Sequence, residues 1–163
     1  MSSHHQSGKP LPDELIEKLI SSRLVNAGLL NLRQLFFGIY DMTIHAGEEG
    51  VSTASRLSQL YEMLRSDITL LDQPPNLHPA ATWGHLMGGY DVGYYGYMWS
   101  LVFAADIYAS GFEGKGKKEV EDSGWLYRQK VLQPGGSKSG MDMLVDYLGR
   151  PPNSKAFLKM LGF

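Results

Sequence analysis

The chain has 163 residues with 43% apolar side chains, a formal net charge of −2 and no cysteine. This length and apolar content suit a single domain over residues 1–163 with a substantial core, and the near-neutral charge argues against a nucleic-acid partner, which selects a clustered basic surface. The lack of cysteine excludes disulfides and thiolate metal sites, and the lack of a hydrophobic leader or a bilayer-length apolar run predicts a cytoplasmic protein without a membrane partner.

The first half of the chain shows three helical stripes. A helix is expected to start at Pro12-Asp13-Glu14, because proline suits the first turn and acids suit the positive end of the helix dipole. Ser52 is the candidate N-cap of the third helix, which ends at residues 72–76. Apolar residues recur at helical spacing in three sets: Leu15, Ile16, Leu19, Ile20 and Leu24; Leu32, Leu35, Phe36, Ile39 and Thr43; Leu57, Leu60, Tyr61, Leu64, Ile68 and Leu71.

The second half also carries helix patterns. Residues 94–110 are apolar on nearly all sides, which predicts a buried helix, since the run is too long for a strand. Another helix is expected over residues 119–132, and Ser139 and Asn153 are candidate N-caps of two short final helices. No pair of strands with a hairpin turn occurs. We therefore expect an all-α bundle of about seven helices, with a Gly/Tyr-rich loop before the buried helix.

The Gly/Tyr-rich stretch spans residues 83–99, which read WGHLMGGYDVGYYGYMW. Glycine frees the backbone and lets a ligand approach it closely, whereas tyrosine and histidine carry polar tips on apolar bodies. The combination predicts a mobile segment that closes on a ligand, with Gly84, Gly88 and Gly89 as hinges.

Three tyrosines in this stretch have helical spacing. Tyr90, Tyr94 and Tyr97 are four and three residues apart, so on one helix they would share a face. A phenol is a neutral donor at pH 7, and such donors suit the oxyanion formed in acyl transfer. From the residues alone, core tyrosines with satisfied hydroxyls remain the alternative. His85 differs because it lies among glycines rather than on an apolar face.

The sequence holds no complete catalytic set. A zinc peptidase of the HExxH type needs two histidines four residues apart, and no two of the five histidines have that spacing. A GxSxG elbow is absent, and residues 114–118, GKGKK, lack the Walker spacing. We expect His45 to be solvated at a helix end. Asp41, Asp106 and Asp146 are candidate buried acids for which the sequence offers no partner.

The Gly/Tyr-rich stretch resembles a known substrate loop. Residues 84–91, GHLMGGYD, and residues 94–97, YYGY, are similar to the loop of the zinc oligopeptidases, the family of thimet oligopeptidase, neurolysin and saccharolysin. Order and spacing agree from about residue 2 to residue 163, so the resemblance covers essentially the whole chain. Other segments that resemble the family are residues 11–20, 31–35, 131–137 and 148–152.

The resemblance implies a mostly helical body with a channel for short peptides, and a zinc ion held by HExxH and a downstream glutamate. In that family the histidine and tyrosines of the loop contact substrate and stabilise the tetrahedral intermediate. Carried over by position, the catalytic contacts are His85, Tyr90 and Tyr97. The implied substrate-binding neighbours are Gly88, Gly89, Tyr94 and Tyr95.

The departures from the family pattern limit this expectation. The zinc ligands of the family lie upstream of the segment that this chain resembles. We therefore expect the chain to bind no metal, to be inactive alone and to need the missing N-terminal part of the peptidase as its partner. Helices that pack on that part would expose an apolar face, which predicts a homo-oligomer. Leu101 replaces a polar residue of many relatives, and Gly93 replaces a longer side chain of some.

Two other hypotheses stay open at the level of sequence. The chain could be a non-catalytic helical module, derived from that family, that binds peptides or proteins. It could also be an active enzyme by another route, although no nucleophile or metal set is visible. Titration with short peptides separates the fragment from the binding module, because tight binding by the isolated chain favours the module.

Overall fold

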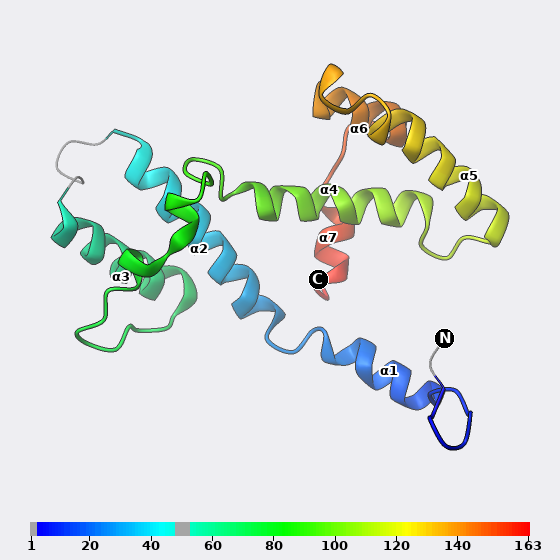
Figure 1. Ribbon diagram of the computed structural model, residues 1–163, viewed down its shortest axis with the longest axis horizontal. Coiled ribbons are helices and arrows are strands. Elements are labelled where there is room, and N and C mark those ends of the chain that lie inside the picture. Colours follow the sequence, from blue (N-terminus) through cyan, green and yellow to red (C-terminus); the bar gives the residue numbers. More distant parts are fainter. Residues whose placement is uncertain (1–2, 48–52) are drawn as a thin grey trace.

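The computed structural model describes residues 3–47 and 53–163, and it is built from helices (Figure 1). Short η turns connect the α-helices, and the described residues form no β-strand beyond an isolated bridge between Ser3 and Pro10. The predicted all-α fold of about seven helices is confirmed. The α-helices are α1 (Asp13–Ser22), α2 (Ala27–His45), α3 (Ala54–Thr69), α4 (Gly96–Gly111), α5 (Lys117–Tyr127), α6 (Gly140–Leu148) and α7 (Lys155–Met160).

The core lies between α2 and α3. Phe36 and Tyr40 of α2 are almost completely buried, and the ring of Tyr61 from α3 meets Phe36 edge-on with centroids 4.8 Å apart. The Tyr40 hydroxyl donates to the Leu57 carbonyl oxygen at 3.2 Å, so the buried phenol keeps a hydrogen-bond partner. Of the predicted α2 stripe, Phe36 faces α3 and meets Tyr61, whereas Leu35 and Ile39 lie on the side of α4.

Helix α1 lies apart from this core. Asn26, with φ of 60°, turns the chain between α1 and α2, and α1 extends away from the other helices (Figure 1). Its apolar stripe was expected to pack, yet α1 buries none of its residues. Among the described residues, no helix is long and apolar enough to cross a membrane.

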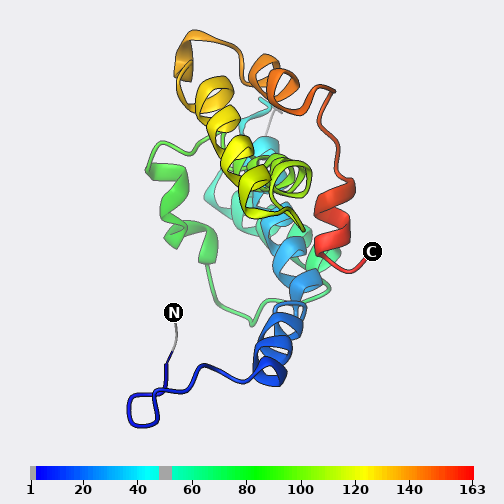
Figure 2. The ribbon, with the colours of Figure 1, turned by 90° about the vertical axis from the view of Figure 1, so that its right-hand side faces the viewer.

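The C-terminal helices gather around α4. Helix α7 lies alongside α4, and α5 and α6 pack near its far end (Figures 1 and 2). Asp106 of α4 is buried and accepts two hydrogen bonds from Arg150, at 2.8 and 2.6 Å. It also accepts one from the Asn153 N–H at 2.9 Å. This carboxylate fixes the segment that leads into α7, and the expectation that Asp106 has no partner was wrong.

The prediction that the apolar helix is buried was also wrong. Only Asp106 and Gly111 of α4 are buried, whereas Trp99 is 57% exposed and Tyr108 is 61% exposed. Helix α2 covers the start of α4, and the C-terminal helices contact the rest of α4. The outer face of α4 is left uncovered by the described residues. An apolar pattern on all sides shows that a helix could be buried on every face. Whether it is buried depends on other segments of the fold that must cover it.

The helix ends test the predicted caps. The Ser139 hydroxyl accepts from the Asp142 N–H at 3.2 Å, so this N-cap is confirmed. Asn153 also caps α7, because its side-chain oxygen accepts from the N–H of Lys155, the first residue of that helix, at 2.9 Å, whereas Ser154 makes no side-chain cap bond. Ser52 lies outside the described residues. The helix expected over residues 119–132 divides into α5 and a π-helical turn, η3 (Arg128–Leu132).

Candidate functional site

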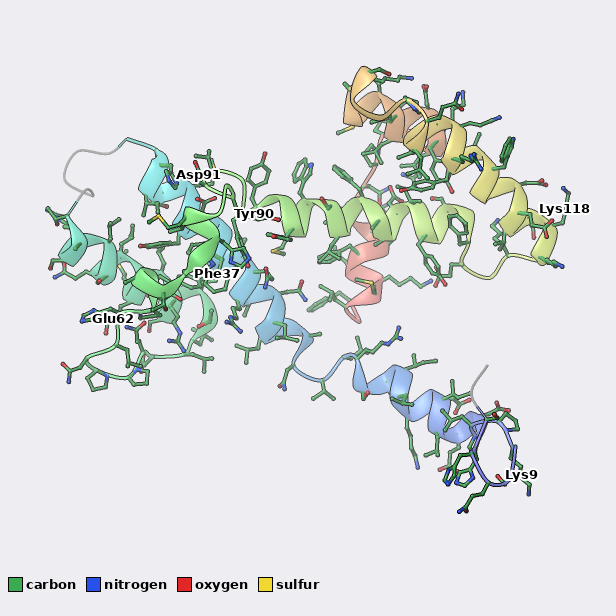
Figure 3. The ribbon with its side chains drawn as sticks, viewed as in Figure 1. Lys9, Phe37, Glu62, Tyr90, Asp91 and Lys118 are labelled. Atoms are coloured by element: carbon green, nitrogen blue, oxygen red, sulfur yellow. The ribbon has the colours of Figure 1, made fainter. Side chains whose placement is uncertain are left out.

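The Gly/Tyr-rich stretch forms a loop between α3 and α4 that returns to the side of α2. The short 3₁₀ turn η1 (Pro79–Thr82) precedes it, and a second such turn, η2 (Gly84–Met87), lies within it before the chain enters α4. Figure 3 shows Tyr90 and Asp91 at the place where α2 and the start of α4 meet. The helix pattern thus begins only at Gly96, later than the sequence suggested.

Trp83 attaches the beginning of this loop to the core. Its ring stacks on Phe37 of α2 with centroids 4.6 Å apart, and it meets the Tyr94 ring edge-on at 4.9 Å. Tyr94 is buried, and its hydroxyl donates to the Gln34 side-chain oxygen of α2 at 3.0 Å. Burial raises the pKa of Tyr94, so this phenol stays protonated at neutral pH.

Asp41 of α2 attaches the end of the loop. Its side chain is completely buried, and its two carboxylate oxygens accept from the backbone N–H groups of Val92 and Tyr94, each at 3.0 Å. Val92 has φ of 61°, a left-handed conformation that is strained for a β-branched residue. The expectation that Asp41 has no partner was wrong, because its partners lie about fifty positions later in the sequence.

The loop brings His85, Tyr90, Tyr94 and Tyr97 together in one cluster, which we call the His/Tyr cluster. The His85 ring lies edge-on to all three tyrosines, at centroid distances of 5.5, 5.2 and 6.1 Å for Tyr90, Tyr94 and Tyr97 respectively. The rings of Tyr90 and Tyr97 stack at 5.4 Å. The three tyrosines do not come together on one helix face, as was predicted, since Tyr90 and Tyr94 precede α4 and only Tyr97 belongs to it.

Two tyrosines of the His/Tyr cluster line an open hollow. Tyr90 is 45% exposed and Tyr97 is 40% exposed, and both line a hollow of about 600 Å³ together with Gln34, Ser100 and Leu101. A hydrogen bond with the Tyr90 side chain, followed by desolvation, raises the pKa of Tyr97 to about 12. The Tyr97 phenol therefore remains a hydrogen-bond donor across the neutral range.

The other predicted site residues lie around this cluster rather than in it. Gly89 has φ of 83°, which only glycine adopts without strain. A side chain at Gly88 would come within 3.2 Å of the Gly84 carbonyl oxygen. Tyr95 lies against Gly38 of α2 and lines a separate apolar groove of about 390 Å³ between α2 and α4.

The structure adds detail to two further sequence expectations. His45 is the last residue of α2 and is exposed, as expected, and its Nδ1 also lies 2.8 Å from the Asp41 carbonyl oxygen and 3.1 Å from the Asp41 carboxylate. Asp146 is not buried, and it pairs with Lys138, whose ammonium lowers the pKa of that carboxyl.

Sequence reasoning gave no site role to three residues that build the site, namely Gln34, the candidate buried acid Asp41, and Trp83 at the start of the Gly/Tyr-rich stretch. The helical stripe marks none of them as functional, because each acts through a partner far away in the chain. Within residues 3–47 and 53–163, no three histidine, aspartate or glutamate side chains gather as a metal site. The described residues thus offer hydrogen-bond donors, but they do not fit a zinc ion.

Comparison with known proteins decides the family. Residues 1–163 match the family model of peptidase family M3 over their whole length. The chain belongs to peptidase family M3.

Several curated M3 relatives align with nearly the whole chain. Saccharolysin from Saccharomyces cerevisiae is 38% identical over 164 residues, which cover 99% of this chain. Thimet-like oligopeptidase from Dictyostelium discoideum is 34% identical and oligopeptidase A from Escherichia coli is 32% identical, each over 99% of this chain. The chain spans only 22% to 24% of the length of these three relatives.

Proposed function

We propose that this M3 chain supplies the substrate-facing His/Tyr loop of a metallo-oligopeptidase that cleaves short peptides. The observation that carries the proposal is the His/Tyr cluster, in which His85, Tyr90 and Tyr97 converge beside an open hollow. The names of the aligned relatives support a peptidase of short substrates, since they include two oligopeptidases.

The chemistry of the cluster suits a role in peptide hydrolysis. Attack on an amide carbonyl places negative charge on its oxygen, and donors aimed at that oxygen stabilise the transition state. Tyr97 is the preferred donor in this proposal, because its phenol is exposed and stays protonated. The rings of Tyr90 and His85 contact the Tyr97 ring, and in this proposal they would contact the peptide next to the reacting carbonyl.

The remaining predicted site residues form part of the same proposal. Gly88 and Gly89 leave the backbone of the turn open to an extended peptide, and buried Tyr94 holds the cluster in place. Tyr95 faces the other groove, so its contact with substrate would need a peptide long enough to pass around the start of α4.

Hydrolysis needs more than this chain in our proposal. The described residues do not fit a zinc site, so the zinc implied by the family resemblance would be held by the part of the M3 fold that this chain does not span. That part is the proposed partner, and the chain alone is proposed to be inactive. A cytoplasmic location also remains a proposal.

A hybrid enzyme tests the role of Tyr97. In the hybrid, this chain replaces the aligned segment of yeast saccharolysin, and hydrolysis of a quenched-fluorescent peptide is measured. Tyr97→Phe removes one donor and should lower kcat by about 10²–10³-fold with a smaller change in KM. Tyr108→Phe is the matched control, because Tyr108 is an exposed tyrosine of the same helix outside the cluster. Equal kcat values for both variants would refute the proposed role.

The isolated chain tests the proposed inactivity. No turnover is expected with added zinc or with a chelator, and chelator-sensitive turnover at enzyme-like rates would overturn this expectation. Titration of the same chain with the short peptide, in the absence of turnover, separates the alternative. Tight binding by the isolated chain, together with an inactive hybrid, would favour a non-catalytic peptide-binding module.

A further inference from the structure

Two backbone N–H groups of the loop donate to the same side chain, which lies outside the loop. The Asp41 carboxylate comes from the C-terminal part of α2, and its two oxygens accept from the N–H groups of Val92 and Tyr94, just before α4 begins. The separations in sequence are 51 and 53 residues. The contact is therefore a tertiary clamp rather than a local turn.

The hydrogen bonds of this clamp are strong, because their acceptor is a buried carboxylate. A buried carboxylate is costly unless hydrogen bonds satisfy it, and bonds from N–H groups to a charged acceptor are stronger than neutral ones. The Asp41 side chain is 0% exposed, and His45 Nδ1 supplies a third contact at 3.1 Å. Loss of one acceptor would leave a backbone N–H of the loop without its partner in a partly or fully buried position.

The clamp also explains how Val92 keeps a strained backbone. A β-branched residue at φ of 61° persists only where the surrounding structure holds it. The same helix allows the loop to approach closely at Gly38, where the Tyr95 Cα atom lies 3.4 Å from the place a side-chain carbon would take. Helix α2 is thus shaped to receive residues 92–95 in one conformation.

We propose that Asp41 is the positioning residue of the His/Tyr cluster. It fixes the backbone on either side of Gly93, and this fixes the Tyr94 ring, which contacts His85 at 5.2 Å and Tyr97 at 5.0 Å. The conformational part of this proposal stands alone, whereas its link to catalysis rests on the function proposed above. Asp41 does not touch substrate in this proposal, and it acts through the loop.

Amide hydrogen exchange of the full 163-residue chain tests the clamp. In the unaltered protein, the Val92 and Tyr94 amides should exchange far more slowly than the amides of the loop residues Gln73, Asn76 and Leu77. Exchange of both amides at the rate of those loop residues would overturn the clamp without any variant. This measurement also decides the question if a variant fails to fold.

Asp41→Asn gives the sharper comparison, because it keeps the shape and replaces one acceptor by a donor. Exchange of the Val92 and Tyr94 amides should rise by about tenfold or more beyond any change in global stability. Asp106→Asn is the matched control, since Asp106 is another buried, hydrogen-bonded carboxylate, in the second half of α4, whose partners are Arg150 and Asn153 rather than the loop. An equal rise at Val92 and Tyr94 in both variants would overturn the proposal.

Catalysis in the saccharolysin hybrid separates positioning from general support. Asp41→Asn should lower kcat by about tenfold or more with a smaller change in KM, whereas Asp106→Asn should leave kcat unchanged. A loosened loop with unchanged kcat, in a hybrid where Tyr97→Phe does lower kcat, would refute positioning and leave the proposed function intact. A loosened loop with no effect of Tyr97→Phe would refute the proposed function and leave the clamp intact.

Discussion

Asp106 and Arg150 form a paired contact in which both guanidinium Nη atoms meet both carboxylate oxygens, at 2.8 and 2.6 Å. The pair joins α4 to the segment before α7, across 44 positions of sequence. The hydrogen bonds from Arg150 lower the pKa of Asp106, and the Asn153 N–H acts in the same direction against the opposing effect of burial.

This pair predicts a pH-dependent stability. Because the folded pKa of Asp106 is depressed, its contribution is fully present above the unfolded value of about 4 and is lost as pH falls through the folded pKa. Asp106→Asn should lower the free energy of unfolding by about 2–3 kcal/mol at pH 7, and the difference should shrink below pH of about 4. Denaturant unfolding at several pH values measures this, with the exposed Asp122→Asn as control. A difference that is constant from pH 7 to pH 3 would contradict the assignment.

Gly111, at the end of α4, predicts a steric effect. A Cβ atom there would lie 2.2 Å from the Tyr147 hydroxyl oxygen and 3.1 Å from that of Ser123, so Gly111→Ala should destabilise the protein by about 1–3 kcal/mol. Gly124→Ala in α5 is the matched control, because nothing lies within 4 Å of its Cβ position and alanine favours helix. Thermal unfolding should show opposite signs for the two changes. Tyr147→Phe in the Gly111→Ala background should recover part of the loss.

The aromatic core between α2 and α3 predicts how much stability two variants of α2 lose. Phe36 is 1% exposed, and its removal in Phe36→Ala leaves a cavity against Tyr61, which should cost about 3–5 kcal/mol. Leu35→Ala on the same helix, at a half-exposed position, should cost about 1 kcal/mol or less. Urea unfolding compares the two, and similar losses would show that the core does not lie between α2 and α3.

The apolar groove between α2 and α4 predicts self-association. Ile39, Met42 and Trp99 line this groove and are exposed in the described part of the chain, and exposed apolar surface of this kind drives association. Sedimentation at increasing concentration should show a dimer, and Trp99→Gln should weaken it by about tenfold or more. Tyr108→Gln changes an exposed aromatic of the same helix outside the groove, and it should leave association unchanged. A chain that stays monomeric throughout would refute the predicted homo-oligomer.

Much of the fold could be predicted from periodicity, because helix formation depends on near neighbours in the sequence. The stripe containing Leu57, Tyr61 and Leu64 predicted α3, and Tyr61 indeed enters the core. Packing was less predictable, because burial depends on segments far away in the chain. The stripe of α1 is left unpacked, and the all-apolar α4 keeps Trp99 largely exposed.

In the candidate site, too, the residue types could be predicted from sequence, whereas their contacts with distant segments could not. Spacing alone grouped Tyr90, Tyr94 and Tyr97, and the family resemblance added His85. The structure brings all four side chains together. The predicted common helix face was wrong, because a run of glycines let the chain turn before α4 instead of extending the helix. Asp41 was a candidate buried acid, but its role could not be found from its own neighbours, since an acid near the end of a helix shows no sequence signal of the distant backbone that it will hold.

Trp83 gives this loop an optical reporter of its own. Its indole stacks on Phe37 and lies 6.1 Å from the His85 ring, and it is partly buried, whereas Trp99 and Trp125 are both 57% exposed. Replacement of the two exposed tryptophans by phenylalanine would leave a single emitter at the hinge of the loop. Its emission would respond to displacement of the neighbouring rings, so opening of the loop could be timed by stopped-flow fluorescence without any attached dye.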